Sequence, residues 1–153
     1  LPYPVFGGEN GGAVTRWLAQ EVYVPLYSDV RAGDRFRDKP FLLAGTLYIR
    51  NTDPQAAMTV TAVDYHDTEG RKLRSFIDKP LTVGPLTTIS YTIPENDTVG
   101  GSGAKFLIRW QSDTPIVEPI MESIMIGTQM QQGISFLCQG RVIAGTKTAP
   151  PPP

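Results

Sequence analysis

The residues of this chain that could carry out chemistry are few and far apart in the sequence. His66 is the only histidine and Cys138 the only cysteine. His66 could act as a general base, because the pKa of imidazole lies near neutrality, and Asp64 or Asp67 could orient its ring. A cysteine nucleophile would need His66 beside Cys138 in space. The sequence therefore offers one alternative active site, formed by His66, Asp64 and Cys138.

The pattern around these residues favours structural roles instead. Cys138 alternates with Ile134 and Phe136, which is typical of a small buried side chain on the inner face of a strand. His66 stands at a strand end before a turn at 67–70, where an exposed polar ring is ordinary. We therefore predict that the protein is not an enzyme, and we assign no catalytic residue and no cofactor.

A soft-metal site is the alternative chemical function. Thioether, thiolate and imidazole groups suit copper, and the chain offers Met121, Met125, Met130, Cys138 and His66. Met121 and Met125 share one face of a predicted strand. However, the sequence has no Met-x-Met or His-x-His cluster to fix these ligands, and methionine commonly fills cores. A copper-binding or carrier protein is therefore the second hypothesis, and no metal ligand is assigned.

A glycine-rich loop formed by Gly100, Gly101, Ser102 and Gly103 invites comparison with phosphate-binding loops. In such loops, consecutive backbone N–H groups cradle an anion. A P-loop continues through Gly-Lys-Ser/Thr into a helix, whereas here Ala104 follows and a strand comes next. The sequence therefore predicts a tight inter-strand loop with unusual φ angles.

The composition is typical of one globular domain that does not bind nucleic acid. The 153 residues include 14 basic and 15 acidic side chains, for a net charge of -1. A near-neutral chain lacks the basic surface on which nucleic-acid affinity depends, so we expect no nucleic-acid partner. No apolar run approaches the ~20 residues of a membrane helix, so we expect no transmembrane segment. The single cysteine excludes an intrachain disulfide.

Alternating apolar residues predict an all-β fold built around residues 41–77. We predict three consecutive antiparallel strands there, joined by turns at 50–55 and 67–70. Val60 and Val63 can share one face only if a bulge lies between them. The 14 prolines and 15 glycines suit a protein rich in turns.

The remaining segments complete an immunoglobulin-like antiparallel β-sandwich of about eight strands. Residues 17–27 form the first strand, and Pro25 assigns that run to an edge position. Residues 116–126 and 133–143 are predicted as the last two strands. Only residues 13–20 carry a helical pattern, enough for one short turn.

The chain divides into three parts. Residues 1–14 are predicted to form a flexible N-terminal arm, because prolines and glycines dominate them. Residues 15–145 form the β-sandwich domain. Residues 146–153 form a proline-rich tail, which cannot pair with a sheet since proline has no backbone N–H.

Six short motifs occur in one order along the chain: VYVPLYS at 22–28, LYIRNTDP at 47–54, VDY at 63–65, DKP at 78–80, GGSGA at 100–104 and GISF at 133–136. Together they resemble a bacterial family catalogued as domain of unknown function 3124, over residues 22–143. The resemblance implies an exported protein, periplasmic or otherwise associated with the cell envelope. It implies no activity and no site residues.

We therefore expect a non-enzymatic binding or structural module of the bacterial cell envelope. Edge strands expose unpaired backbone groups, so one of them is a candidate contact surface. The other candidates are the loop Gly100, Gly101, Ser102 and Gly103 and four aromatic residues, Trp17, Tyr23, Tyr27 and Tyr48. The expected partner is an unidentified protein, with self-association through an edge strand as one form.

Overall fold

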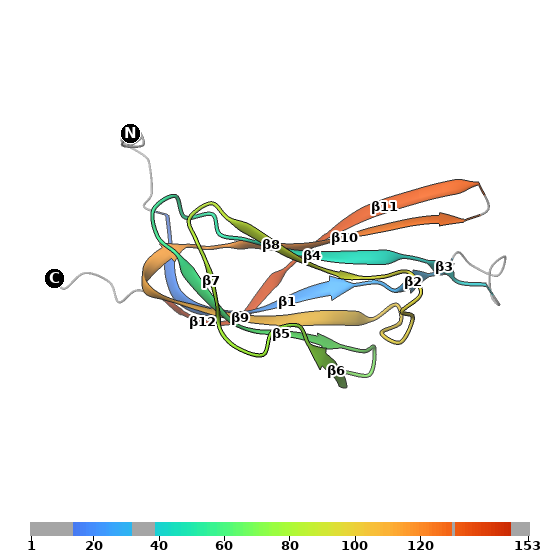
Figure 1. Ribbon diagram of the computed structural model, residues 1–153, viewed down its shortest axis with the longest axis horizontal. Coiled ribbons are helices and arrows are strands. Elements are labelled where there is room, and N and C mark those ends of the chain that lie inside the picture. Colours follow the sequence, from blue (N-terminus) through green and yellow to red (C-terminus); the bar gives the residue numbers. More distant parts are fainter. Residues whose placement is uncertain (1–13, 32–38, 130, 148–153) are drawn as a thin grey trace.

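The computed structural model describes residues 14–31, 39–129 and 131–147. This part of the chain is an all-β sandwich of two facing sheets, with a short two-stranded ribbon at one end (Figure 1). It contains no helix, and hence none that is long and apolar enough to cross a membrane. The predicted arm and tail lie outside the described residues, except for Val14, Thr146 and Lys147.

The larger sheet has six strands and the smaller has four. The larger contains, in order, β12 (Arg141–Lys147), β1 (Arg16–Leu26), β9 (Ala104–Val117), β5 (Met58–His66) and β6 (Lys72–Ser75), and β7 (Leu81–Val83) also pairs with β5. The smaller contains β11 (Gln132–Gln139), β10 (Ile120–Gln129), β4 (Ala44–Arg50) and β8 (Thr88–Ile93). The ribbon pairs β2 (Asp29–Val30) with β3 (Phe41–Leu42). All of these pairings are antiparallel.

The core lies between the sheets and follows the period of two in each strand. Every second residue is buried from Gln20 to Leu26 in β1 and from Ala104 to Trp110 in β9, because successive side chains of a strand point to opposite faces. The fully buried side chains of largest volume include Trp110, Tyr65, Phe106 and Leu26. The described residues form twelve strands rather than about eight, and four of them (β2, β3, β6 and β7) are only two to four residues long.

The prediction for residues 41–77 is right for the second pair of strands and wrong for the first. β5 and β6 pair as predicted, whereas β4 and β5 lie in opposite sheets. The turn after β4 therefore carries the chain from one sheet to the other. The predicted bulge is confirmed by a register shift between Val60 and Ala62, which leaves both Val60 and Val63 buried.

Two further predictions are wrong. The described part of the segment 13–20, residues 14–20, forms no helical turn, since β1 begins at Arg16 and its early residues pair with both β9 and β12. Residues 116–126 are not one strand, because the chain changes sheet at Glu118 and Pro119, between β9 and β10. Ile116 is consequently a core residue, whereas Ile126 is exposed on the outer face of the smaller sheet.

The crossing from β4 to β5 is held by the buried side chain of Asn51. Its amide nitrogen donates to the carbonyl oxygens of Ala56, Val83 and Gly84 at 2.9, 3.1 and 3.0 Å. Its amide oxygen accepts the backbone N–H of Asp53 at 3.0 Å. One side chain thus ties the crossing loop to the connection between β7 and β8.

Asp53 extends the same cluster to the other two chain segments at this end. Its carboxylate accepts the backbone N–H of Gln55 and of Ala56, each at 2.9 Å, and that of Val117 at 3.1 Å. Arg16 forms an ion pair with it at 3.2 Å. Burial alone would raise the pKa of Asp53, but the three N–H donors and Arg16 outweigh burial and hold the pKa below its usual value.

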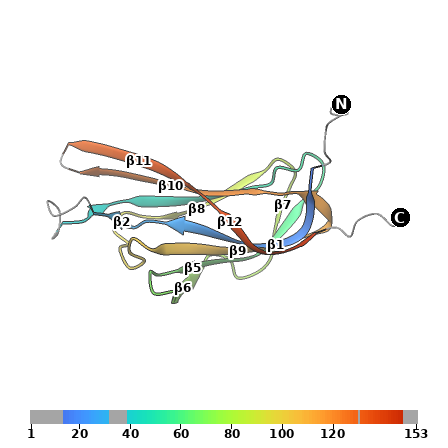
Figure 2. The same ribbon diagram turned by 180° about the vertical axis from the view of Figure 1, so that it is seen from behind.

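At the edge of the sandwich formed by β11 and β12, one extended run of chain serves both sheets. Residues 132–139 pair with β10 in the smaller sheet, and residues 141–147 pair with β1 in the larger (Figure 2). Gly140 lies between them and donates its N–H to the Met121 carbonyl at 2.7 Å. A Cβ here would lie 2.6 Å from that carbonyl oxygen and 3.0 Å from Val22 and Val24. Only glycine fits at this crossing without displacing backbone.

We predict that Asp53→Asn destabilises the protein by about 2 to 3 kcal/mol at pH 7, because an NH₂ group would face backbone donors that lose their acceptor. A lowered folded pKa means that the carboxylate stabilises the fold above the usual pKa, and that this is lost as the pH falls through the folded pKa. The free energy of unfolding, measured with urea, should therefore fall more for the wild type than for the variant below about pH 4. The exposed Asp113→Asn serves as the control. Equal stability of wild type and Asp53→Asn at pH 7 would contradict this role.

We predict that Gly140→Ala destabilises the protein by about 1 to 3 kcal/mol, the usual effect of overpacking against backbone that cannot yield. Gly133→Ala is the matched control on the same strand, since its Cβ would have no neighbour closer than 3.9 Å. Thermal unfolding of both variants measures the difference. A Gly140→Ala variant as stable as Gly133→Ala would show that the crossing does not depend on glycine.

Candidate functional site

The structure does not bring the alternative active-site residues together. His66 ends β5, which neighbours β6 in the larger sheet, whereas Cys138 lies in β11, which continues into β12 at the opposite side. Asp64 accepts a hydrogen bond from the Ser75 hydroxyl at 2.6 Å and pairs with Lys72 at 3.4 Å. These three residues therefore form no common site.

Asp67 has a structural role in the turn that follows β5. Its carboxylate accepts the Arg71 backbone N–H at 2.8 Å and pairs with the Arg71 guanidinium at 3.4 Å. The amide hydrogen bond, together with the Arg71 charge, holds the pKa of Asp67 below its usual range. Gly70, three residues after Asp67, has a φ of 84°. Glycine adopts this backbone conformation easily, which allows the tight turn.

Three sulfur side chains share the inner face of the smaller sheet. Cys138 pairs with Ser123, so Met121 and Met125 are its two diagonal neighbours on β10. Burial raises the pKa of the Cys138 thiol, which disfavours the thiolate that a metal would need. Met130 lies outside the described residues. Within the described ranges, no three His, Cys, Asp or Glu side chains are placed to hold a metal ion.

The glycine-rich loop packs against its neighbours. Gly100 is buried, and a Cβ there would overlap the Tyr65 side chain. The Thr68 hydroxyl donates to the Gly100 carbonyl at 2.9 Å and accepts the Gly103 N–H at 3.0 Å. Gly101 has a φ of 74°, as the predicted unusual geometry requires. Ser102 is exposed at the tip of this loop.

The four aromatic residues proposed as contacts lie at separate places. Trp17 is near the start of β1, where the Lys147 ammonium lies 5.1 Å from its ring centre. Tyr23 lies at the other end of the β1–β12 pairing, opposite Arg141. Tyr27 packs edge-on against Phe136, with 5.4 Å between ring centres. Tyr48, in β4 of the smaller sheet, lies under Arg50 at 5.0 Å.

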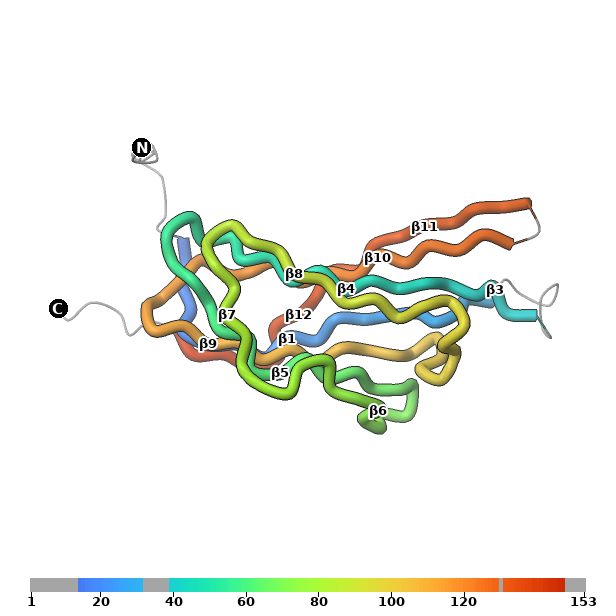
Figure 3. Tube along the Cα trace, viewed as in Figure 1, coloured from blue at the N-terminus to red at the C-terminus, as the bar shows by residue number. Residues whose placement is uncertain are grey.

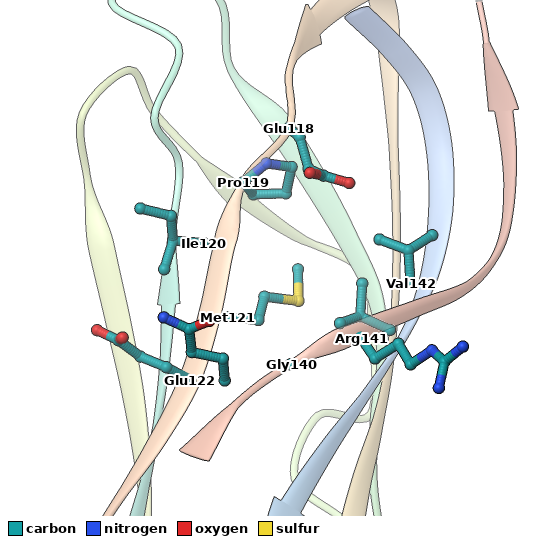
Figure 4. Close-up of a pocket in the computed structure, with 10 residues that line it drawn as sticks. Glu118, Pro119, Ile120, Met121, Glu122, Gly140, Arg141 and Val142 are labelled. Carbon is teal, nitrogen blue, oxygen red and sulfur yellow. The ribbon is translucent and has the colours of Figure 1, made fainter. Parts of the chain in front are cut away.

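A groove of about 540 Å³ lies on one side of the Gly140 crossing. Because β11 departs from β10 here, the start of β10 pairs with β4 on one side and has no strand beside it on the other. In Figure 4, Met121 points between β10 and the crossing strand, while Ile120 and Glu122 lie on the other side of β10. Glu118 at the rim accepts a hydrogen bond from Gln20 at 2.8 Å. The groove is thus lined both by apolar side chains, among them Met121 and Val142, and by charged ones, among them Glu118.

The free edge of β11 is the candidate functional site. Gly140 donates to Met121, and hydrogen-bonded pairs alternate along an antiparallel ladder. The same alternation directs the backbone groups of Phe136 and Cys138 toward β10, and those of Ser135, Leu137 and Gln139 away from it. No strand in the described part of the chain pairs with this outer edge.

β11 lacks the features that usually protect an edge strand. Its eight residues contain no charge and no proline, and its pairing with β10 runs without a register shift. The β10–β11 hairpin projects from the sandwich toward the end where the β2–β3 ribbon lies (Figure 3). Its outer face is apolar, since Ile126 and Leu137 are 52% and 50% exposed.

The other edges are protected or shorter. β1 loses its β12 neighbour after Tyr23, but Pro25 has no N–H, and its carbonyl accepts the Ser123 hydroxyl at 2.6 Å. β12 carries charged residues at both ends and two register shifts against β1. β6 is four residues long and contains Lys72 and Arg74. β8 is also uncharged, but it has six residues and is followed directly by a proline.

The sequence predicted that an edge strand would be a contact surface without identifying which one. Two signals were present: the uncharged run at 123–140, which contains β11, and the proline at position 25. Neither could be interpreted fully, because which strand lies at an edge depends on the order of strands in each sheet. The groove beside Gly140 had no sequence signal, since it results from the crossing.

Comparisons with known proteins support the family resemblance. A search of curated proteins finds no match. A solved structure titled "Crystal Structure of Thermotoga maritima 1070" is similar, with 10% sequence identity, coverage of 83% of this chain and 97% of that chain, and a TM-score of 0.46. Residues 19–143 match the sequence profile of a family described as "Protein of unknown function (DUF3124)". Since the match covers most of the chain, this protein belongs to the DUF3124 family.

Proposed function

We propose that this protein is a non-enzymatic binding module of the bacterial cell envelope that holds a protein partner by pairing an added strand with β11. The observation that supports this most is the unprotected outer edge of that strand. Ser135, Leu137 and Gln139 direct their backbone N–H and C=O groups away from β10, and all three are exposed. An added strand would satisfy these groups by main-chain hydrogen bonds, as in other strand-addition complexes.

The side chains of β11 suit a partner with alternating apolar residues. Ile134, Phe136 and Cys138 are half-buried on the inner face, and Leu137 is exposed on the outer face. A strand beside β11 would place its own alternate side chains next to both sets. The hydrogen bonds would supply much of the affinity, and these apolar neighbours would select the partner.

The non-enzymatic part of the proposal is supported by the separation of the reactive groups. His66 and Cys138 lie in different sheets, and the carboxylates of Asp64 and Asp67 are engaged by Lys72 and Arg71. The copper alternative receives less support, because His66 lies far across the sheet order from the sulfur side chains. The envelope location rests on the family resemblance alone.

We predict that a synthetic eight-residue peptide with alternating Val and Thr binds along β11. In an NMR titration, the backbone amide signals of Ser135, Leu137 and Gln139 should shift, because the peptide carbonyls would accept their N–H groups. Signals from β8 at the opposite edge of the same sheet should stay unchanged.

Two controls make this test specific. A peptide N-methylated at every second residue cannot complete the ladder and should not bind. Ser135→Pro removes one outward N–H without altering a bond to β10 and should weaken binding at least about tenfold, whereas Ser135→Thr keeps the N–H and should bind as the wild type does. Equal binding by the N-methylated peptide, or no shift in β11, would overturn the proposed function.

A further inference from the structure

We infer that the strand taken up by β11 is β11 of a second copy, so that two molecules join their smaller sheets into one eight-stranded sheet. This inference rests on the proposed function, because it requires the outer edge of β11 to accept a strand. It adds the identity of the partner and the register of the contact.

The charge distribution favours a second copy. In a two-fold symmetric contact the same patch meets itself, so any charged residue near the axis faces a like charge. The eight residues of β11 carry none, although charged residues make up 19% of the chain. Charges resume at Arg141, beyond the end of the strand. The uncharged run extends over residues 123–140, so it covers all of β11, the segment that self-pairing would oppose, together with most of β10.

The outward backbone groups also select one register. When two β11 strands pair in antiparallel fashion, the numbers of any two opposite residues add up to the same value, which defines the register. When the two residue numbers add up to 272, Gly133 of each copy lies opposite Gln139 of the other, and Ser135 of each copy lies opposite Leu137 of the other. All four outward residues then form hydrogen-bonded pairs, giving about eight bonds, whereas any shift by two residues loses at least two of them.

This register places Phe136 of the two copies on either side of the two-fold axis. Ser135 then lies opposite Leu137 of the second copy, so the apolar outer face formed by Ile124, Ile126 and Leu137 continues across the contact. On the inner face, Ile134 lies opposite Cys138 of the second copy. Each of these inner pairs is of the non-hydrogen-bonded kind, in which Cα atoms approach to about 4.5 Å.

Sedimentation equilibrium of the full chain, over about 1 to 100 μM, tests the association in the range where small interfaces form. The wild type and Ser135→Thr should both reach the mass of a dimer. Ser135→Pro should remain a monomer at every concentration, with an unchanged circular-dichroism spectrum to show that it is folded. A wild type that stays monomeric throughout, or a Ser135→Pro variant that dimerises equally, overturns the inference.

Disulfide trapping tests the register. Under mild oxidation Ile134→Cys should become a covalent dimer, because the introduced thiol faces Cys138 of the second copy at a separation that a disulfide can span. The wild type should not be trapped, since Cys138 faces Ile134 of the second copy. Ser90→Cys on β8 is the control thiol at the other edge. The register is overturned if all three proteins are trapped to the same extent. It is also overturned if Ile134→Cys forms no covalent dimer in a sample that is dimeric.

The two proposals fail in different ways. If the alternating peptide binds β11 while the protein stays monomeric and untrapped, strand addition stands and the partner is another protein. If neither the peptide nor a second copy perturbs Ser135 and Leu137, the proposed function fails as well.

Discussion

The passage of one strand through both sheets at Gly140 is the constraint on which the exposed surfaces of this protein depend. Because residues 132–147 serve the smaller sheet first and the larger sheet afterwards, each sheet lacks a neighbour on one side of the crossing. On one side the start of β10 is left beside an open groove. On the other side the end of β1 keeps its pairing with β9 but has no β12 neighbour, and Pro25 and Ser123 close that edge. β11 itself becomes the outermost strand, with its ladder to β10 intact and its other side open.

The cluster of Asn51 and Asp53 ties together the chain segments at the end of the sandwich where the chain passes from β4 to β5. Two side chains there join the crossing after β4, the connection after β7 and the end of β9 through seven hydrogen bonds from or to backbone groups. The hydrogen bonds of this cluster and of Gly140 hold the frame from which β11 extends. Binding to a preorganised edge avoids much of the ordering entropy that a flexible segment would lose.

Local features of the fold could be predicted from the sequence, and its long-range connections could not. The bulge between Val60 and Val63 follows from alternation alone. The edge position predicted for residues 17–27 from Pro25 is wrong for most of β1, which lies between β12 and β9, and holds only for the residues after Tyr23, where the β12 neighbour ends. In contrast, the turn at 50–55 has the residues of a hairpin turn, and only its bonds to Val83, Gly84 and Val117 show that it changes sheet. The candidate site could not be predicted for the same reason, because whether a strand lies at an edge depends on where all the other strands of the sheet lie.

Amide hydrogen exchange, followed residue by residue at increasing protein concentration, tests the central claim about β11 most directly. In dilute solution the N–H groups of Ser135, Leu137 and Gln139 should exchange rapidly, while those of Phe136 and Cys138, bonded to β10, exchange slowly. Raising the concentration should slow exchange in the first group and leave the second unchanged. Outward amides that are already protected in dilute solution would contradict the open edge of β11, and outward amides that exchange equally fast at every concentration would contradict its pairing with a second copy.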